Sequence, residues 1–323
     1  MTVLVTGGAG YIGSHVVRLL CDRGDTVVVV DDLVTGLRDR IAGVPLVEMD
    51  LALSTAPKLL EAVMREYDVV KVIHFAGRKQ VGESVLRPAW YYQQNVGSLA
   101  NLLLAMEQSK VSQLVFSSSA AVYGTSEGSA LREDTVTQPI NPYGESKLIG
   151  EWLLADAVSA QGLRASSLRY FNVAGAGWPE LGDTAVLNLV PMVLERLDQG
   201  LAPLIFGDDY LTEDGTCVRD YIHVLDLAEA HLAALDSLSK GQARHTIYNV
   251  GTGIGSSVRA MVDKIVEVSG ATAVPEVRNR RVGDPAVVVA DPTAIAEAIG
   301  WTAKLGLPQI VQSAWDSHLI LKT

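Results

Sequence analysis

The sequence has only two cysteines, Cys21 and Cys217. They could form one disulfide at most, and Cys21 falls within a predicted helix, so we expect two reduced thiols. No apolar run approaches the roughly 18 residues that a transmembrane helix needs. No charged-then-apolar leader precedes the first predicted strand, which begins within the first three residues. These absences predict a cytoplasmic protein without a membrane span.

Positive charge and metal ligands are also scarce. The net charge of −11 argues against nucleic acid or an anionic membrane as a partner. The six histidines are scattered, and none is spaced from another as metal ligands are, so we expect no metal site. The sequence also shows no internal repeat and no low-complexity tract.

Glycine, by contrast, is concentrated near the start of the chain. A short apolar run ending at Val5 indicates a strand buried on both faces, and a helical pattern begins at Tyr11. Gly7, Gly10 and Gly13 lie at this strand-to-helix junction. Such glycines allow a tight turn, a close approach to a pyrophosphate and close packing of helix on sheet, respectively. The helix N-terminus would bind the anion.

A carboxylate follows the second predicted strand. Residues 26–30 form another buried apolar run, and Asp31 comes directly after it. A dinucleotide fold places an acid about 20 residues beyond the glycines to bind the ribose 2′-hydroxyl, which favours NAD over NADP. The glycine spacing is G-x-x-G-x-x-G, however, and not the G-x-G-x-x-G of most dehydrogenases.

Strand and helix patterns alternate through the first half of the chain. They predict an α/β fold with a doubly wound parallel (Rossmann) sheet. Predicted strands are 3–5, 26–30, 45–48, 69–75, 113–117 and 165–170, and predicted helices are 11–23, 56–65, 88–108 and 142–160. We expect residues 1–176 to form an NAD-binding domain, to which a helix at 225–238 and a strand at 248–250 return.

The pattern weakens after residue 176. Residues 177–323 are expected to form mainly a smaller α/β substrate-binding lobe. It would contain a helix at 187–199, a strand at 203–206, the segment 212–223, a helix at 257–269 and the segment 278–290.

Polar residues follow several of the predicted strands. In a doubly wound sheet the ligand lies beyond the carboxyl ends of the strands, so these positions are candidates for binding. They include Asp50, Lys79 and Ser117. A serine run is usually a loop and a lysine after a strand is usually solvated, so each signal alone is weak. Their convergence on one sheet edge favours a site.

Tyr143 and Lys147 are four residues apart on a predicted helix that begins at Asn141 and Pro142. They therefore share one helix face. A tyrosine near an ammonium and the positive nicotinamide ring can lose its proton below its usual pKa of about 10 and act as a base. The hydroxyl of Ser119 could share the hydrogen bond. Such Tyr/Lys pairs are common, and only the dinucleotide pattern makes this one informative.

These motifs together resemble the extended short-chain dehydrogenase/reductase superfamily. Within it, five further segments resemble the UDP-glucose (UDP-galactose) 4-epimerase family, and the similarity runs from residue 3 to about residue 291. The segments are 74–77 (HFAG), 81–85 (VGESV), 116–124 (FSSSAAVYG), 168–172 (LRYFN) and 214–224 (DGTCVRDYIHV).

The resemblance implies an NAD-dependent isomerase that acts through a transient 4-keto sugar. Tyr143 would remove the 4-hydroxyl proton, Ser119 would assist, and Lys147 would hold the nicotinamide ribose and lower the pKa of the tyrosine. The implied NAD contacts are Gly7, Gly10, Tyr11, Ile12, Gly13, Asp31, Asp50, Leu51, Phe75, Ala76, Gly77, Lys79, Asn95, Ser117, Tyr143, Lys147 and Tyr170. The implied substrate contacts are Ser119, Tyr143, Asn172, Asn188, Leu189, Phe206, Arg219, Arg281, Asp284 and Val288.

Departures from related families refine this expectation. Sugar-nucleotide 4,6-dehydratases carry an Asp-Glu pair where this chain has Ala120 and Ala121, whose methyl groups cannot transfer protons. Val288 stands where some epimerases have a tyrosine that rejects N-acetyl sugars, so UDP-GlcNAc and UDP-GalNAc are possible further substrates. Asp32 stands where asparagine is usual, next to the predicted adenosine site.

Two other functions share these motifs. One is an NAD-dependent oxidoreductase, or an epimerase of a different UDP-sugar; the other is an NAD-sensing regulator, which would not need a tyrosine base. The resemblance also implies a homodimer that pairs the helices 88–108 and 142–160.

Overall fold

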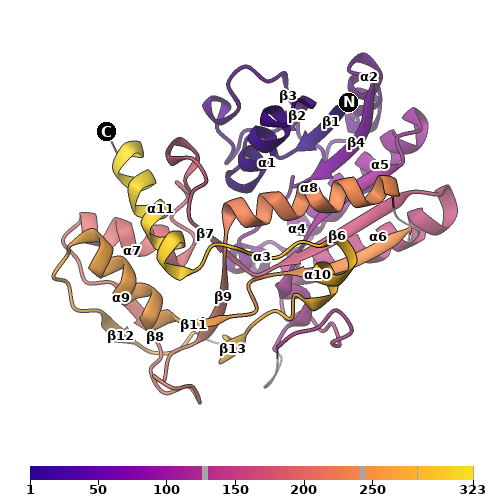
Figure 1. Cartoon of the computed structure of the whole chain (residues 1–323). Coiled ribbons are helices and arrows are strands. Elements are labelled where there is room, and N and C mark those ends of the chain that lie inside the picture. The colour runs from indigo at the N-terminus through magenta and orange to yellow at the C-terminus, as the bar shows by residue number, and fades with distance from the viewer. Residues whose placement is uncertain (126–129, 241–243, 282, 323) are drawn as a thin grey trace. The chain divides into compact units, whose positions relative to one another are not determined.

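The computed structural model describes residues 1–125, 130–240, 244–281 and 283–322 (Figure 1). The chain forms two compact units, each assembled from separate stretches of sequence. The first comprises Met1–Gly124, Val136–Arg169 and Ala228–Tyr248, and the second Thr125–Thr135, Tyr170–Leu227 and Asn249–Thr323. The main stretch of the first unit ends at Arg169, compared with the expected division at residue 176, and Ala228–Tyr248 belongs to the same unit.

A seven-stranded sheet forms the centre of the first unit. Its strand order is β10-β6-β5-β4-β1-β2-β3, and the pairs of β1 with β2 and β4, of β2 with β3 and of β4 with β5 are parallel. This arrangement confirms the predicted doubly wound sheet. The strands are β1 (Thr2–Thr6), β2 (Thr26–Asp31), β3 (Leu46–Glu48), β4 (Val69–His74), β5 (Gln113–Ser119), β6 (Arg164–Tyr170) and β10 (His245–Val250).

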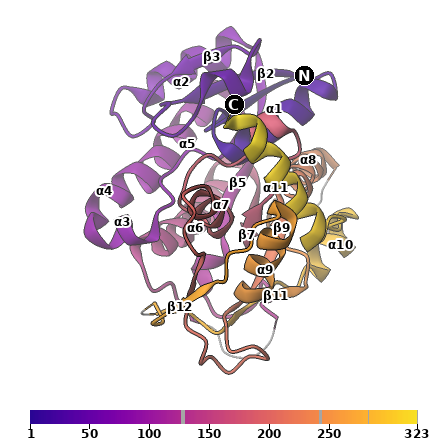
Figure 2. The same ribbon diagram turned by 90° about the vertical axis from the view of Figure 1, so that its left-hand side faces the viewer.

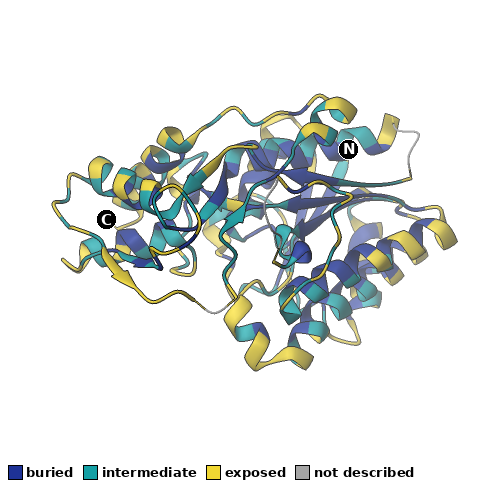
Figure 3. Cartoon of the chain, turned by 90° about the horizontal axis from the view of Figure 1, so that it is seen from below, coloured by how far each residue is buried: buried dark blue, intermediate teal, exposed yellow. Residues whose placement is uncertain are grey.

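Helices cover both faces of this sheet. On one face α2, α5 and α6 pack over a core of strand residues such as Leu4 and Leu114, and on the other lie α1 and α8 (Figure 1). The strands are mostly buried, whereas the outer sides of the helices are exposed (Figure 3). The helices are α1 (Tyr11–Asp22), α2 (Ala56–Glu66), α3 (Val81–Leu86), α4 (Pro88–Tyr92), α5 (Ser98–Ser109), α6 (Pro142–Gln161) and α8 (Val224–Lys240).

Local sequence signals set the ends of α6, the helix that carries the predicted base. The Asn141 side chain accepts a hydrogen bond from the backbone N–H of Gly144, 2.9 Å away, and Pro142 occupies the first turn. Gly162 ends the helix in the left-handed conformation, with φ of 71°. These caps confirm the boundaries predicted from Asn141, Pro142 and Gly162.

The predicted helix at 88–108 is interrupted. A π-helical turn, Gln93–Gly97, separates α4 from α5, and the preceding helix α3 was not predicted. π-Helical turns inside helices are found frequently at functional sites. This one carries Gln94 and Asn95, both of which are buried.

The second unit contains short strands and a group of packed helices. β9 pairs in parallel with β7 and β13 and antiparallel with β11, while β8 pairs with β12. The strands are β7 (Asn172–Ala174), β8 (Leu204–Phe206), β9 (Val218–His223), β11 (Gly255–Ser257), β12 (Glu276–Arg278) and β13 (Val287–Val288).

The helices of this unit are α7 (Leu189–Asp198), α9 (Val258–Ser269), α10 (Thr293–Ile299) and α11 (Leu307–Leu321). α7, α9 and α11 share an apolar core with β9, and Figure 2 shows α9 beside α11. α10 and α11 were not predicted. Among the described residues, no helix is both long enough and apolar enough to cross a membrane.

Candidate functional site

The three predicted glycines form the turn from β1 to α1. Gly7 has φ of 71°, and a Cβ there would lie 2.6 Å from the Ala76 nitrogen, so only glycine fits. A Cβ on Gly13 would collide with the carbonyl oxygen of Gly7. At Gly10 the nearest atom to such a Cβ is the Gly7 oxygen, 3.2 Å away, and no other lies within 4 Å. The backbone is therefore open for close approach at Gly10.

The N-terminus of α1 is suited to an anion. Its N-cap, Gly10, supplies no side-chain cap, and the first turn has no acidic residue. Among the described residues, no hydrogen-bond partner is found for the backbone N–H groups of Ile12 and Gly13. The first N–H groups of a helix have no partner within it and carry its positive dipole end. A pyrophosphate would satisfy them.

Asp31, at the end of β2, fixes the position of this turn. Its carboxylate accepts hydrogen bonds from the backbone N–H of Ala9, at 3.0 Å, and from that of Leu33, at 2.9 Å. Burial raises the pKa of Asp31, and the two N–H donors oppose that rise. Each oxygen keeps a second lone pair, which a ribose hydroxyl could use.

The residues that follow β3 and β4 lie at the same edge of the sheet. Asp50 accepts from the backbone N–H of Ala52 at 2.8 Å, and Leu51 is buried. The Phe75 ring lies 4.6 Å from that of His231, between ring centroids. Lys79 is exposed. Ala76 and Gly77 continue the backbone along this edge, where a Cβ on Gly77 would lie 3.2 Å from the Asn95 amide and 3.7 Å from the Lys147 ammonium.

Tyr143 and Lys147 share one face of α6 and meet the end of β5. Lys147 Nζ donates to the Ser117 carbonyl oxygen at 2.8 Å and lies 6.0 Å from the centre of the Tyr143 ring. Ser119, the last residue of β5, accepts from the Ala121 N–H and also hydrogen-bonds to Tyr143. The structure therefore brings together the base, the lysine and the assisting hydroxyl that the sequence predicted.

Burial raises the pKa of Tyr143 above its usual value, and the hydrogen bond with Ser119 lowers it in part. Lys147 Nζ, 6.0 Å from the centre of the tyrosine ring, donates to the Ser117 carbonyl, and burial lowers the pKa of Lys147 itself to about 8. The expectation that an ammonium and a bound nicotinamide ring together lower the pKa of Tyr143 concerns the complex with NAD.

A buried ion pair beneath this site was not predicted. Glu151 lies one turn beyond Lys147 on α6 and forms two hydrogen bonds with Arg169, of 2.9 and 2.6 Å. Ser118 donates to Glu151 at 2.5 Å, and Arg169 donates to the Tyr123 hydroxyl at 2.9 Å. This network joins α6, β5 and β6. The only signal in the sequence was a glutamate four residues after the lysine.

The predicted substrate residues, apart from Ser119 and Tyr143, lie in the second unit. Arg219 forms an ion pair with Asp284, at 2.6 Å, and faces Val288 in the register of β9 and β13. The Arg281 guanidinium lies 4.1 Å from the centre of the Phe206 ring. Residue 282, within the predicted Arg-Arg-x-Gly-Asp motif, is outside the described residues.

The remaining predicted residues are distributed around this group. Asn172 begins β7 and pairs with Tyr221 of β9, while Tyr170 ends β6 and falls in the second unit. Asn188 is the N-cap of α7, Leu189 follows it, and the Asn188 amide donates to Asp183 at 2.6 Å.

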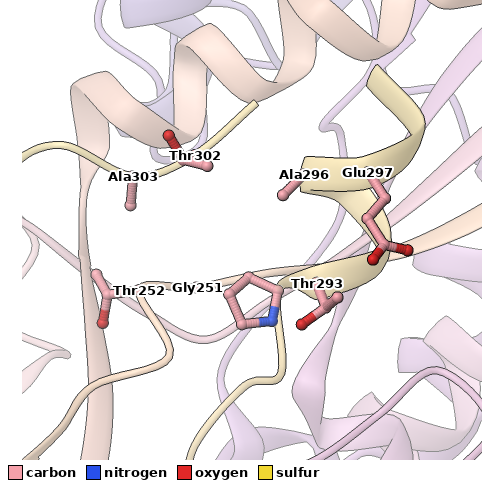
Figure 4. Close-up of a pocket in the computed structure, with 8 residues that line it drawn as sticks. Gly251, Thr252, Thr293, Ala296, Glu297, Thr302 and Ala303 are labelled. Atoms are coloured by element: carbon pink, nitrogen blue, oxygen red, sulfur yellow. The ribbon is translucent and has the colours of Figure 1, made fainter. Parts of the chain in front are cut away.

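A hollow of about 260 Å³ in the second unit contains none of the predicted residues. Figure 4 shows Thr302 and Ala303 on one side of it and Ala296 and Glu297 on the other. The buried Asp220 carboxylate accepts hydrogen bonds from the backbone N–H groups of Thr252, which lines the hollow, and of Gly253. Glu297 is its one charged lining residue, so the hollow offers no set of groups for proton or hydride transfer.

The first unit therefore fits NAD. The open backbone at Gly10, the N–H groups of Ile12 and Gly13, and the carboxylate of Asp31 match a pyrophosphate and a ribose. Lys147 and Gly77 match a nicotinamide ribose beside β5. All of these groups belong to the predicted cofactor set.

Comparison with known proteins agrees with this geometry. Residues 3–251 match the model of the NAD dependent epimerase/dehydratase family. A UDP-glucose 4-epimerase of Azospirillum brasilense is 47% identical, with 98% of this chain and 92% of the relative covered.

Two solved structures are also similar. One is UDP-glucose 4-epimerase from Brucella ovis in complex with NAD, with a TM-score of 0.92, 42% identity and 97% of each chain covered. The other is UDP-glucose 4-epimerase from Bifidobacterium longum in complex with NAD+ and UDP, with a TM-score of 0.90, 37% identity and coverage of 99% of this chain and 98% of that one. With its glycine turn, acidic ribose position and Tyr143/Lys147 pair, this chain belongs to the NAD dependent epimerase/dehydratase family, as an isomerase of the UDP-glucose 4-epimerase group.

Proposed function

We propose that the protein interconverts UDP-galactose and UDP-glucose by epimerisation at C4, with NAD held tightly throughout. The observation that carries this proposal is the grouping of Tyr143, Lys147 and Ser119 at the end of β5, on the sheet edge that also presents the dinucleotide turn. The named relatives, which are UDP-glucose 4-epimerases, support the same reaction.

Tyr143 takes the proton from the 4-hydroxyl of the sugar and returns it at the end of the cycle. When bound, NAD supplies a hydride acceptor that becomes the donor for the return step, so a 4-keto sugar forms and is reduced on its other face. Ser119 hydrogen-bonds to Tyr143 and orients its hydroxyl. Lys147 holds the nicotinamide ribose and adds positive charge near the tyrosine. Burial raises the pKa of Tyr143, and the positive charges of Lys147 and of a bound nicotinamide ring would lower it.

We assign the uridine diphosphate to the second unit. Arg219 and Arg281 present guanidinium groups, which suit diphosphate oxygens. Phe206 offers a ring beside Arg281, and Asn188 an amide at the start of α7. Arg219 is paired with Asp284, so we expect this pair to rearrange or share its donors when the diphosphate binds. The Bifidobacterium longum enzyme was solved with UDP, which supports a substrate that carries this nucleotide.

We also propose that N-acetylated UDP-hexoses are accepted. Val288 lies opposite Arg219 in the parallel pair of β13 with β9. A valine leaves more room beside the sugar than a tyrosine would. Val288→Tyr should therefore remove activity on UDP-GalNAc while leaving activity on UDP-galactose within about threefold. Equal losses on both sugars would contradict this assignment.

We further propose a cytoplasmic homodimer. Two free cysteines are compatible with a reducing compartment. On neighbouring helices α5 and α6, Leu104 and Trp152 are large apolar side chains that are 49% and 58% exposed. A second copy of the chain would cover them.

The test is to incubate the purified protein with UDP-galactose and, separately, with UDP-GalNAc, without added cofactor, and to separate the products. We expect 4-epimers of both, no accumulation of free NADH, and no turnover by Tyr143→Phe. Tyr67→Phe, on a tyrosine outside the site, should retain activity. Net NADH formation would instead indicate a nucleotide-sugar oxidoreductase, and no turnover with NAD supplied would refute the epimerase assignment.

A further inference from the structure

An ion pair crosses the carboxyl edge of the sheet above β1. Asp32 directly follows β2, and Arg78 lies four residues after the end of β4. Arg78 Nη2 lies 2.5 Å from Asp32 Oδ2. Because β1 lies between β2 and β4 in the sheet, a bridge between the ends of these two strands passes over the end of β1, where the glycine turn begins.

The predicted path of the dinucleotide runs in the same direction. Asp31, on the β2 side of the turn, is the predicted contact of the adenosine ribose, and Lys147, at the end of β5, is that of the nicotinamide ribose. A molecule that connects these two points must cross the glycine turn. The bridge between Asp32 and Arg78 crosses it as well. The ion pair and the predicted cofactor path therefore pass over the same strand end.

Each partner is held in place from its own side. Asp32 Oδ1 accepts from the backbone N–H of Val34 at 3.1 Å, which leaves Oδ2 directed at the arginine. Arg78 Nε donates to the Gln94 side chain at 3.1 Å. The Asn95 amide accepts from the Arg78 N–H at 2.7 Å and donates to the Arg78 carbonyl at 3.0 Å. The pair can therefore close with little further loss of side-chain entropy.

The pair is also placed so that it can open. The side chains of Arg78 and Asp32 are 15% and 25% exposed, so they are sheltered from solvent but not enclosed. Charges in such a position attract more strongly than a fully exposed pair, yet water can replace the contact. Gln94 and Asn95 of the π-helical turn contact the arginine through bonds that do not involve the aspartate.

We propose that Asp32 and Arg78 form a clasp that closes over bound NAD and slows its release. This proposal rests on the proposed function, because that reaction needs the reduced cofactor to stay bound until the hydride has been returned. If the reduced cofactor left after the first half of the cycle, the keto sugar could not be reduced and the enzyme would be left without its cofactor. The clasp reduces this loss by retaining the cofactor, without a role for Asp32 or Arg78 in proton or hydride transfer.

The experiment measures NAD release in the absence of any sugar. Holoprotein loaded with radiolabelled NAD is diluted into excess unlabelled NAD, and the retained label is followed by rapid gel filtration. Asp32→Asn and Arg78→Met remove one charge each and keep side-chain size. We expect each to speed release by about three- to tenfold, the range for partly sheltered ion pairs. The double variant should release NAD no faster than the faster single variant, because either change opens the clasp.

Arg18→Met serves as the matched control. It breaks an exposed ion pair with Asp22 on α1, in the same unit, and should leave the release rate unchanged. Urea unfolding of each variant without NAD checks that the protein remains folded. If Arg78→Met perturbs its own loop, Asp32→Asn still tests the ion pair, because an asparagine can accept the same hydrogen bond from the Val34 N–H.

Three results would overturn the clasp. Unchanged release in both single variants would do so. So would faster release in Arg78→Met alone, because the arginine would then contact the cofactor directly. Independent effects that multiply in the double variant would also contradict it. A wild-type protein that binds no NAD would instead refute the proposed function, a result distinct from normal NAD binding with unaltered release.

Discussion

Lys147 carries its charge in a buried position, at 6% exposure. Its ammonium is satisfied by one carbonyl oxygen, that of Ser117, and burial lowers its pKa from 10.5 to about 8. A shift of this size corresponds to roughly 3 kcal/mol. The residue therefore opposes folding of the cofactor-free protein, which is what we expect of a side chain kept for the proposed contacts with the ribose and with Tyr143.

Lys147→Met should therefore stabilise the cofactor-free protein while it abolishes turnover. The pKa in the folded state is lower than in the unfolded state, so the cost of burying the charge is fully present below about pH 8 and is relieved as the pH rises towards 10.5. At pH 7 we expect a gain on the order of 1–3 kcal/mol, which shrinks by pH 10. Urea unfolding at both pH values measures it. A loss of stability at pH 7 would contradict a buried ammonium.

The state of Tyr143 should depend on the cofactor. Because burial raises its pKa, the phenol of the cofactor-free protein should ionise above pH 10, and the positive nicotinamide ring should move that ionisation to lower pH. The measurement is an ultraviolet difference titration of wild type against Tyr143→Phe, with and without NAD. An ionisation below pH 10 in the cofactor-free protein would show that the nicotinamide ring is not needed to lower the pKa of Tyr143.

At the scale of elements, a buried ion pair between Glu151 and Arg169 attaches α6 to the sheet. Their side chains are 2% and 4% exposed, and the pair joins the helix to β6 and, through Ser118, to β5. Because Ser117 and Ser119 flank Ser118, the same bonds hold the strand end that meets Lys147 and Tyr143. The position of the proposed base thus depends on an ion pair whose glutamate lies about two turns away along the helix.

Glu151→Gln should destabilise the protein by about 3–5 kcal/mol, because it leaves the Arg169 guanidinium buried without its counter-charge. The double variant Glu151→Leu with Arg169→Met should lose less than the sum of the two single variants. Denaturant unfolding measures these values. Glu61→Gln, at the exposed pair of α2 with Arg65, is the control and should cost no more than about 1 kcal/mol. Similar costs at both sites would contradict the role assigned to burial.

Elements with strong local signals were predictable from the sequence, and elements that depend on distant partners were not. The apolar runs of β1 and β2, the glycine turn and the caps of α6 follow from periodicity and single residues. The π-helical turn at Gln93–Gly97 does not, because its side chains bond to Arg78 in another loop. α10 and α11 were also missed, although Pro292 at the start of α10 and Pro308 in the first turn of α11 are helix-start signals.

The same distinction applies to the candidate site. Tyr143, Lys147 and Asp31 stand in motifs whose spacing indicates their chemistry. Arg78 and Asp32 are 46 positions apart, and Glu151 and Arg169 are 18 apart, so their contacts appear only in the fold. A charged residue in the sequence does not show which residue of opposite charge it contacts in the fold.

At the scale of the whole molecule, the exposed faces of α5 and α6 predict self-association. We expect sedimentation equilibrium to give twice the chain mass of 34.5 kDa. Trp152→Glu should produce a monomer, because it places a charge on a surface that the second copy would bury. Leu59→Glu, on α2 at 48% exposure, should remain dimeric. A monomeric wild type, or a Trp152→Glu dimer, would contradict this interface.

The first unit is built from three separate stretches of chain, the last of which is Ala228–Tyr248. This stretch supplies most of α8 and of the edge strand β10. During synthesis, therefore, the chain must leave the ribosome as far as Val250, the end of β10, before the seven-stranded sheet can be complete, although its first six strands are finished by residue 170. A nascent chain that stalls in this interval would present β6 as an open edge, a surface prone to pairing with other strands. Vulnerability to aggregation should thus be greatest during one defined period of translation.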